Sequence, residues 1–235
     1  ILGARGPLFG VPQMVISRIP FGWRGNIVPS TLNAALAALG WFAVNSVTAT
    51  FALNTLVGIP LVLSLVIVVA AQIAVAFFGH NLIHAFHKAV FPFLLGAFIL
   101  GAIFVIPNAD VSVNANTGSI GGFLIAMGAA FGYASGWNPF ASDYTRYLKP
   151  DSNKRSVALW SGAGLFVSCA SLMTLGVLAA TVAVPDGLTP TGAFTAPMPG
   201  LVAVLVLLAV VIGSICANSL NVYSATMSFL SLPIK

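Results

Sequence analysis

The sequence predicts an all-α polytopic membrane protein, and three observations support this fold class. The 235 residues are 59% hydrophobic and only 6% charged, whereas a soluble domain has about 25% charged residues. Mean hydropathy is +1.03. Six apolar runs come close to the length of roughly 20 residues that a helix needs to cross a bilayer. They lie at 26–52, 59–79, 89–106, 119–141, 156–184 and 201–223.

These runs predict one transmembrane domain over residues 1–235. Residues 1–25 contain three arginines and several glycines, which we interpret as the end of an earlier span followed by a loop. The chain starts at Ile1 rather than Met and stops directly after a span at Lys235. We therefore expect a fragment of a longer protein.

The basic residues predict the orientation of the spans. All nine fall in alternate connections: Arg5, Arg18, Arg24, Lys88, Arg146, Lys149, Lys154, Arg155 and Lys235. By the positive-inside rule, the connections at 1–25, 80–88, 142–155 and 224–235 are expected to be cytoplasmic. So thin a spread of positive charge does not indicate nucleic-acid binding. The connection at 80–88 also has three histidines, which are either a metal site or polar residues at a helix end: His80, His84 and His87.

The first span holds Trp41 and Asn45, which lie four residues apart and so share one helix face. Trp at mid-span is unusual, since it prefers the membrane interface. A flat aromatic ring one turn from an amide suits a planar heterocycle, which needs a stacking surface and a hydrogen-bonding partner. Helix–helix packing, with the Asn45 amide bonded to a neighbouring backbone, explains the same pattern.

The fourth span ends in "GYASGWNPFASDYTRY", residues 132–147. Gly132, Gly136 and Pro139 weaken regular helical hydrogen bonding. Broken membrane helices are tolerated where they line a cavity, but a plain proline kink is also common. Asp143 and Arg146 follow in the next connection, where we expect an ion pair that contributes little energy.

The sixth span contains Asn218 and Asn221, three residues apart on one face. Unpaired amides in lipid are costly, so this face is expected to look inward, toward a ligand or another helix. Gln72 in the second span is interpreted as a packing residue. The sequence has no Glu, no nucleophile paired with a histidine and no phosphate-binding loop, so we expect a transporter or channel without a cofactor, not an enzyme.

The chain resembles the nucleobase–cation symport family 1, which includes purine–cytosine permeases and relatives for uracil, allantoin, thiamine and hydantoin. Four stretches carry the resemblance: "PQMVISRIPFGWRGNIVPSTLN" (12–33), "GWFAVNSV" (40–47), "GWNPFASDYTRYL" (136–148) and "NSLNVYS" (218–224). The resemblance implies a fold of twelve helices, ten of which form two inverted five-helix repeats. The chain would then cover the end of helix 2 through helix 8, with the six spans as helices 3 to 8.

The resemblance also implies the substrate-binding residues. An aromatic and an amide of helix 3 correspond to Trp41 and Asn45, and an amide of helix 8 corresponds to Asn221, with Asn218 beside it. A second aromatic, on helix 6, corresponds to Trp137 or, in an alternative alignment, to Ala134, which lies next to Tyr133; we favour Trp137. Sodium-coupled members have hydroxyl groups on helix 8 where this chain has Cys216 and Ala217, so the resemblance implies a proton-coupled or a degraded cation site as an alternative to a sodium site.

We therefore expect a secondary active transporter that imports cytosine or a purine with Na⁺ or H⁺. The alternatives are the same fold with allantoin, hydantoin, uracil or thiamine as substrate, or a passive channel or structural membrane protein. The expected partners are the nucleobase, the cation and the lipid bilayer.

Overall fold

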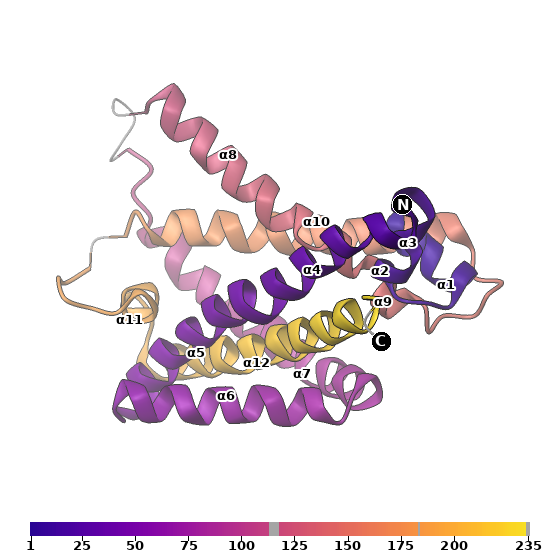
Figure 1. The fold of residues 1–235 in the computed structure, drawn as a ribbon. Helices are drawn as coiled ribbons and strands as arrows, with labels where there is room; N and C mark the ends of the chain where they lie inside the picture. The colour runs from indigo at the N-terminus through magenta and orange to yellow at the C-terminus, as the bar shows by residue number, and fades with distance from the viewer. Residues whose placement is uncertain (113–117, 183, 234–235) are drawn as a thin grey trace. The chain divides into compact units, whose positions relative to one another are not determined.

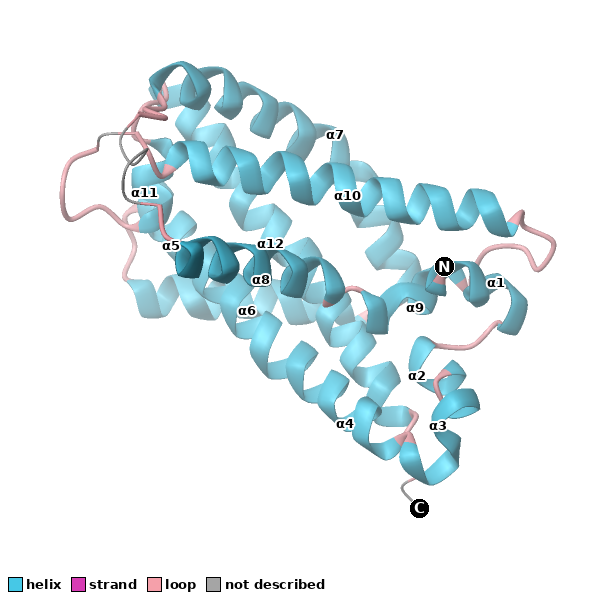
Figure 2. Ribbon diagram, turned by 90° about the horizontal axis from the view of Figure 1, so that it is seen from above, coloured by secondary structure: helices cyan, strands magenta, loops and turns pink. Residues whose placement is uncertain are grey.

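The computed structural model describes residues 1–112, 118–182 and 184–233, and no strand occurs among them (Figures 1 and 2). The elements are short 3₁₀ turns, one π-helical segment (η2) and α-helices. In chain order they are η1 (Leu2–Arg5), α1 (Gly6–Phe9), α2 (Gln13–Ile16), α3 (Arg18–Gly25), α4 (Ile27–Ala35), η2 (Leu36–Trp41), α5 (Phe42–Val57), α6 (Leu61–Phe77), α7 (His80–Val105), η3 (Ile106–Asn108), α8 (Ile120–Ser135), η4 (Asn138–Phe140), α9 (Ala141–Thr145), α10 (Lys154–Ala179), α11 (Pro190–Thr195) and α12 (Gly200–Leu230).

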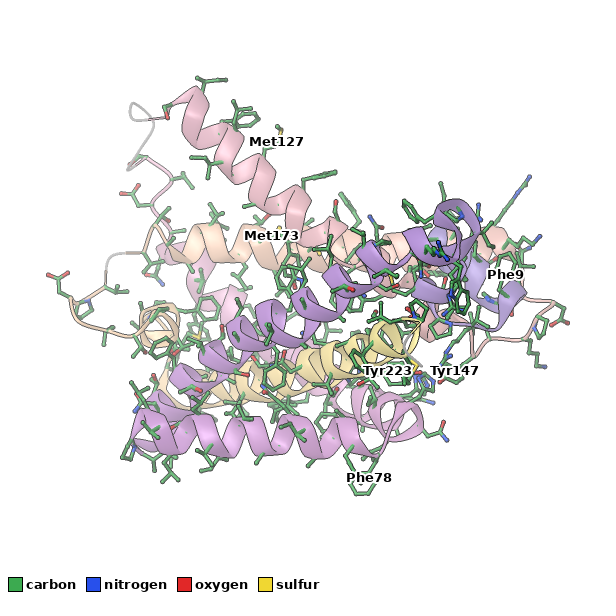
Figure 3. The ribbon with its side chains drawn as sticks, viewed as in Figure 1. Phe9, Phe78, Met127, Tyr147, Met173 and Tyr223 are labelled. Atoms are coloured by element: carbon green, nitrogen blue, oxygen red, sulfur yellow. The ribbon has the colours of Figure 1, made fainter. Side chains whose placement is uncertain are left out.

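Five helical segments of the described chain are long and apolar enough to cross a membrane: Ile27–Val57, His80–Asn108, Ile120–Thr145, Lys154–Ala179 and Gly200–Leu230. Where the sequence predicts a span at 59–79, the structure has the shorter apolar helix α6, of 17 residues. Much of the apolar surface is exposed, as on α8, which has no buried residue and where Met127 projects outward (Figure 3). Such extensive exposed apolar surface is unusual for a soluble protein.

Three expected connections are largely helical instead. Residues 1–25 form the short helices η1, α1, α2 and α3 rather than a loop. Helix α7 starts at His80, and α12 continues to Leu230, so the expectation of loops at 80–88 and 224–235 is wrong over these residues. The physical reason is that neither 80–88 nor 224–230 contains a glycine or proline to end a helix, and Pro233 comes only after the end of α12. Lys235, used for the orientation, lies outside the described residues, and the orientation itself stays a prediction.

The three histidines thus lie in the first turns of α7. The rings of His80 and His84 stack with centroids 6.0 Å apart, and His87 Nε2 lies 3.1 Å from the carbonyl oxygen of Cys216 on α12. No group of three His, Cys, Asp or Glu side chains among the described residues is arranged to hold a metal ion. The contacts of His87 fit the alternative of polar residues at a helix end.

The chain divides into two compact units. Unit 1 comprises residues 1–36, 114–174 and 224–235, and unit 2 comprises residues 37–113 and 175–223. Unit 2 has a small apolar core built by Val105, Leu175, Met198 and Val206. Gly101 of α7 permits this packing, because a Cβ there would lie 3.3 Å from both Met198 and Val206.

In unit 1, buried polar side chains hold the segment 13–33 in place. Asn26 is 1% exposed, and its Nδ2 donates to the carbonyl oxygen of Met14 at 2.7 Å and to Ser30 Oγ at 3.0 Å. Ser17 Oγ donates to the Asn26 amide oxygen. Buried amides are normally paired in this way, because a lone one costs free energy.

Asp143 also lies in the interior of unit 1, so the expectation of a solvated ion pair with Arg146 is wrong for this residue. Asp143 is 1% exposed, and its Oδ1 accepts from the backbone N–H of Gln13 at 2.8 Å. The neighbouring Ser142 Oγ donates to Gln13 Oε1 at 2.7 Å. The carboxylate therefore fixes the first turn of α2 against α9, because it pairs a backbone N–H that the helix leaves unbonded.

Gly6 lets α1 approach α9 closely, and its replacement tests this packing. A Cβ at Gly6 would lie 2.1 Å from Thr145 Oγ1 and 2.7 Å from the backbone nitrogen of Arg146. Since the φ angle of −52° suits any residue, Gly6→Ala tests the clash alone. We expect a loss of about 1–3 kcal/mol in thermal unfolding of the purified protein.

The matched control is Gly128→Ala in α8, where no atom lies within 4 Å of the added Cβ. Its free energy of unfolding should equal that of the wild type or exceed it by up to about 1 kcal/mol, because alanine favours the helix more than glycine does. Equal stability of the two variants would contradict the close approach of α1 to α9.

Candidate functional site

The fourth predicted span is interrupted, as its glycines and proline indicate. Helix α8 ends at Ser135, a turn follows, and the chain resumes as η4 and α9. Tyr133 on the last turn of α8 is 42% exposed. Trp137 lies in the interruption and packs edge-on against Phe140, with centroids 6.0 Å apart. The break therefore places Trp137 at irregular backbone, whereas Tyr133 lies on regular helix just before it.

Trp41 ends the π-helical segment Leu36–Trp41, and Asn45 follows one turn later on α5. Both side chains are half-buried. A π-helical turn inside an α-helix is rare and often occurs at functional sites. No sequence pattern indicates this π-helical turn, because the residues of η2 are ordinary helix formers apart from Gly40.

Asn218 on α12 joins the two asparagines that the sequence singles out. Its Oδ1 accepts from Asn45 Nδ2 at 3.0 Å and from Asn221 Nδ2 at 3.0 Å. Its own Nδ2 donates to the backbone carbonyl of Phe42 at 2.9 Å and to Ser46 Oγ at 3.1 Å. The predicted residues of helices α5 and α12 are thus in direct contact within unit 2.

Two further residues complete this cluster, and sequence reasoning missed their part in it. Ser46 Oγ donates to Gln72 Oε1 on α6 at 2.9 Å, and both residues are buried. Gln72 is therefore bonded to the same cluster, although its Nε2 is buried without a partner among the described residues. We call these five residues the amide network: Asn45, Ser46, Gln72, Asn218 and Asn221.

Cys216 and Ala217 lie one to two residues before Asn218 on α12. The Cys216 thiol is free and 8% exposed, and its carbonyl oxygen accepts from Ser219 Oγ at 2.7 Å. Hard cations prefer oxygen ligands, and neither side chain offers one. These positions give no support for a cation site.

The chemistry of the amide network is neutral. Within the described residues, the hydrogen bonds of its side chains and backbone to other parts of unit 2 all involve uncharged amide, hydroxyl or backbone groups. Amides both donate and accept, so together with the ring of Trp41 they suit a flat, uncharged, polar molecule. Tyr133 and Trp137 belong to unit 1, and their part in such a site stays a prediction.

Comparisons with known proteins point to one class of membrane protein. The sequence profile of a family described as "Permease for cytosine/purines, uracil, thiamine, allantoin" matches residues 1–232. The putative purine-cytosine permease YxlA of Bacillus subtilis is 34% identical over 96% of this chain and 49% of its own length. No solved structure matches.

Two further relatives come from a fungus and a bacterium. The purine-cytosine permease fcyB of Emericella nidulans is 31% identical over 75% of this chain and 35% of its own length. The hydantoin permease of Microbacterium maritypicum is 27% identical over 91% of this chain and 48% of its own length. The chain thus spans at most about half the length of these relatives, which are transporters rather than enzymes.

Ser46→Ala tests whether the amide network is a connected unit. The change removes one acceptor and one donor from a site that is 3% exposed, so Asn218 and Gln72 each lose a partner. We expect a loss of about 2–3 kcal/mol in thermal unfolding. Thr48→Ala is the control, because Thr48 is exposed and bonds only its own helix, at Val44; it should cost about 0.5 kcal/mol or less.

Combining Ser46→Ala with Gln72→Leu should then show a coupling of about 1 kcal/mol, since the two residues share one hydrogen bond. Strict additivity of the two changes would argue that the bond between Ser46 and Gln72 does not form.

Proposed function

Because the chain belongs to the family of permeases for cytosine and purines, uracil, thiamine and allantoin, we propose that it is part of a secondary active transporter for a nucleobase, cytosine or a purine. The protein is an integral membrane protein with apolar helices. Asn45 and Asn221 both donate to Asn218, and Asn45 lies one turn from Trp41; this is the observation that supports a nucleobase most strongly.

In this proposal the base stacks on Trp41, and Asn45 and Asn221 bond its polar edge, with Asn218 beside them. A second aromatic, Trp137 or alternatively Tyr133, covers the other face. Stacking contributes about 1–3 kcal/mol for each face, and each amide bond adds about 1 kcal/mol. The sum fits micromolar affinity, which corresponds to about −8 kcal/mol.

The division of the chain supports transport by alternating access. The resemblance implies that helices 3, 4 and 8 move as one body, and helices 1, 2, 6 and 7 as another. Unit 2 holds α5, α6 and most of α12, which correspond to helices 3, 4 and 8, whereas unit 1 holds α8 and most of α10, which correspond to helices 6 and 7. The grouping is partial, because α4, the first part of helix 3, belongs to unit 1 and α7, which corresponds to helix 5, belongs to unit 2.

Cation coupling is the second part of the proposal. Concentrative uptake of a neutral base needs a driving gradient, and we propose Na⁺ or H⁺. The side chains of Cys216 and Ala217 supply no oxygen ligand, which leaves proton coupling as a full alternative to sodium.

Two rival functions are open to test. A passive channel or structural membrane protein would use the amide network only to join helices, as interhelical amides often do. A transporter for a different heterocycle is favoured by the similarity to a hydantoin permease. Measurements of concentrative uptake distinguish the proposed transporter from a channel or structural protein. Competition between substrates distinguishes cytosine or a purine from another heterocycle.

Uptake of radiolabelled cytosine by cells that express the complete gene product tests the transporter proposal. We expect the wild type to accumulate cytosine against its concentration gradient. Trp41→Ala should raise KM by roughly tenfold to a hundredfold, because a stacking face is lost. Asn221→Ala should raise KM by about tenfold through the lost amide bond. Trp41→Phe keeps an aromatic ring and should lose less, and Thr48→Ala on the exposed face of α5 is the control.

Uptake that never exceeds equilibrium, or that is unchanged in both Trp41→Ala and Asn221→Ala, would reject the symporter. All variants are compared at equal amounts in the membrane, measured by surface labelling.

Competition at high excess identifies the base. Unlabelled cytosine and adenine should suppress uptake of labelled cytosine, whereas allantoin, hydantoin, uracil and thiamine should compete at least about tenfold more weakly, the effect of one unmatched amide bond. If another labelled compound is taken up and a high excess of unlabelled cytosine does not suppress that uptake, cytosine is not the substrate.

A further inference from the structure

Asn218 uses its entire hydrogen-bonding capacity within the protein. An asparagine amide has two N–H donors and one oxygen with two lone pairs. Both donors are engaged by Phe42 O and Ser46 Oγ, and the oxygen accepts from Asn45 and Asn221. The side chain is also completely buried, at 0% exposed. Asn218 therefore has no donor or lone pair left for a ligand.

The backbone carbonyl of Phe42 determines which end of the Asn218 amide donates and which end accepts. The backbone carbonyl of Phe42 can only accept, so Asn218 must turn its Nδ2 toward it. The Asn218 oxygen then faces the other two asparagines, and each must offer it an N–H. Asn45 and Asn221 are thereby held with their amide oxygens turned away from Asn218.

Asn45 and Asn221 keep unused capacity. Neither amide oxygen makes a hydrogen bond within the described part of the chain, and each Nδ2 retains a second N–H. Each amide thus presents one acceptor and one donor side by side. A heterocycle edge that pairs a ring nitrogen or carbonyl with an N–H or amino group complements such an amide.

We propose that Asn218 is a positioning residue: it does not touch the ligand, but orients Asn45 and Asn221 so that each offers one oxygen and one N–H to a heterocycle edge. This inference rests on the proposed function and refines it, because it divides the three asparagines into two that contact the base and one that aims them. Direct contact through Asn218 would require it to give up a bond to Phe42, Ser46, Asn45 or Asn221.

The test is a mutant cycle on binding of radiolabelled cytosine to the purified complete gene product. Asn218→Ala alone should weaken binding by about tenfold, since Asn45 and Asn221 lose their orientation. Asn45→Ala with Asn221→Ala removes both contacts and weakens binding further. Adding Asn218→Ala to that double variant should change Kd by less than about twofold, because nothing remains to be positioned.

Ser219→Ala is the matched control. Ser219 is the next residue on α12 and is also 0% exposed; it bonds Cys216 O in its own helix and His87 Nε2 of α7 at 3.4 Å, but no member of the amide network. It should bind cytosine as the wild type does. Thermal unfolding verifies that each variant is folded, and Asn218→Ser replaces Asn218→Ala throughout if the alanine variant does not fold.

The outcomes are distinct. If Asn218→Ala weakens the double variant by a further tenfold, Asn218 contacts the base or supports the fold generally, and the positioning role is rejected. If Asn218→Ala alone leaves Kd unchanged, the role is also rejected. If the wild type binds neither cytosine nor adenine, the proposed function itself fails.

Discussion

The backbone carbonyl of Phe42 is the group on which the amide network depends. Reversing Asn218 would set its oxygen against that carbonyl and its N–H groups against those of Asn45 and Asn221. Each buried group left unpaired costs about 1–3 kcal/mol, so the reversed arrangement is strongly disfavoured. The bond from Asn218 to the Phe42 carbonyl thus joins α12 to α5 and fixes the orientation of the Asn218 amide within unit 2.

Unit 1 follows the same rule with different groups. Asn26 donates to the carbonyl oxygen of Met14, and Asp143 accepts from the N–H of Gln13. In each case a buried polar side chain is tied to backbone that a helix end leaves unbonded. The chain has only four acidic residues, and the contacts of Asn26, Asp143 and the amide network use neutral amides, hydroxyls, backbone groups and one carboxylate.

The sequence was sufficient for features that depend on local patterns. Apolar runs predicted the helices, and Gly136 with Pro139 predicted the interruption after α8. Helix ends were less certain, because the polar residues His80 and Lys88 suggest a loop, although nothing there breaks a helix. The burial of Asp143 and the bond of Gln72 to Ser46 depend on contacts between distant segments. No periodicity or motif reveals such contacts, so the place of Asp143 was predicted wrongly and the bonding partner of Gln72 was not predicted.

The neutrality of the amide network narrows the chemistry that it suits. A charged ligand loses its hydration on entering an apolar helix bundle, and several kcal/mol of that loss remain unless an opposite charge is supplied. The amide network supplies none, since each hydrogen bond of Asn45, Asn218 and Asn221 involves an uncharged group. An uncharged base loses less hydration free energy on entering the bundle, and hydrogen bonds to amides and stacking on a ring such as Trp41 offset that loss. Neutral heterocycles are therefore a better match to unit 2 than the permanently cationic thiamine, even though permeases for both occur in this family.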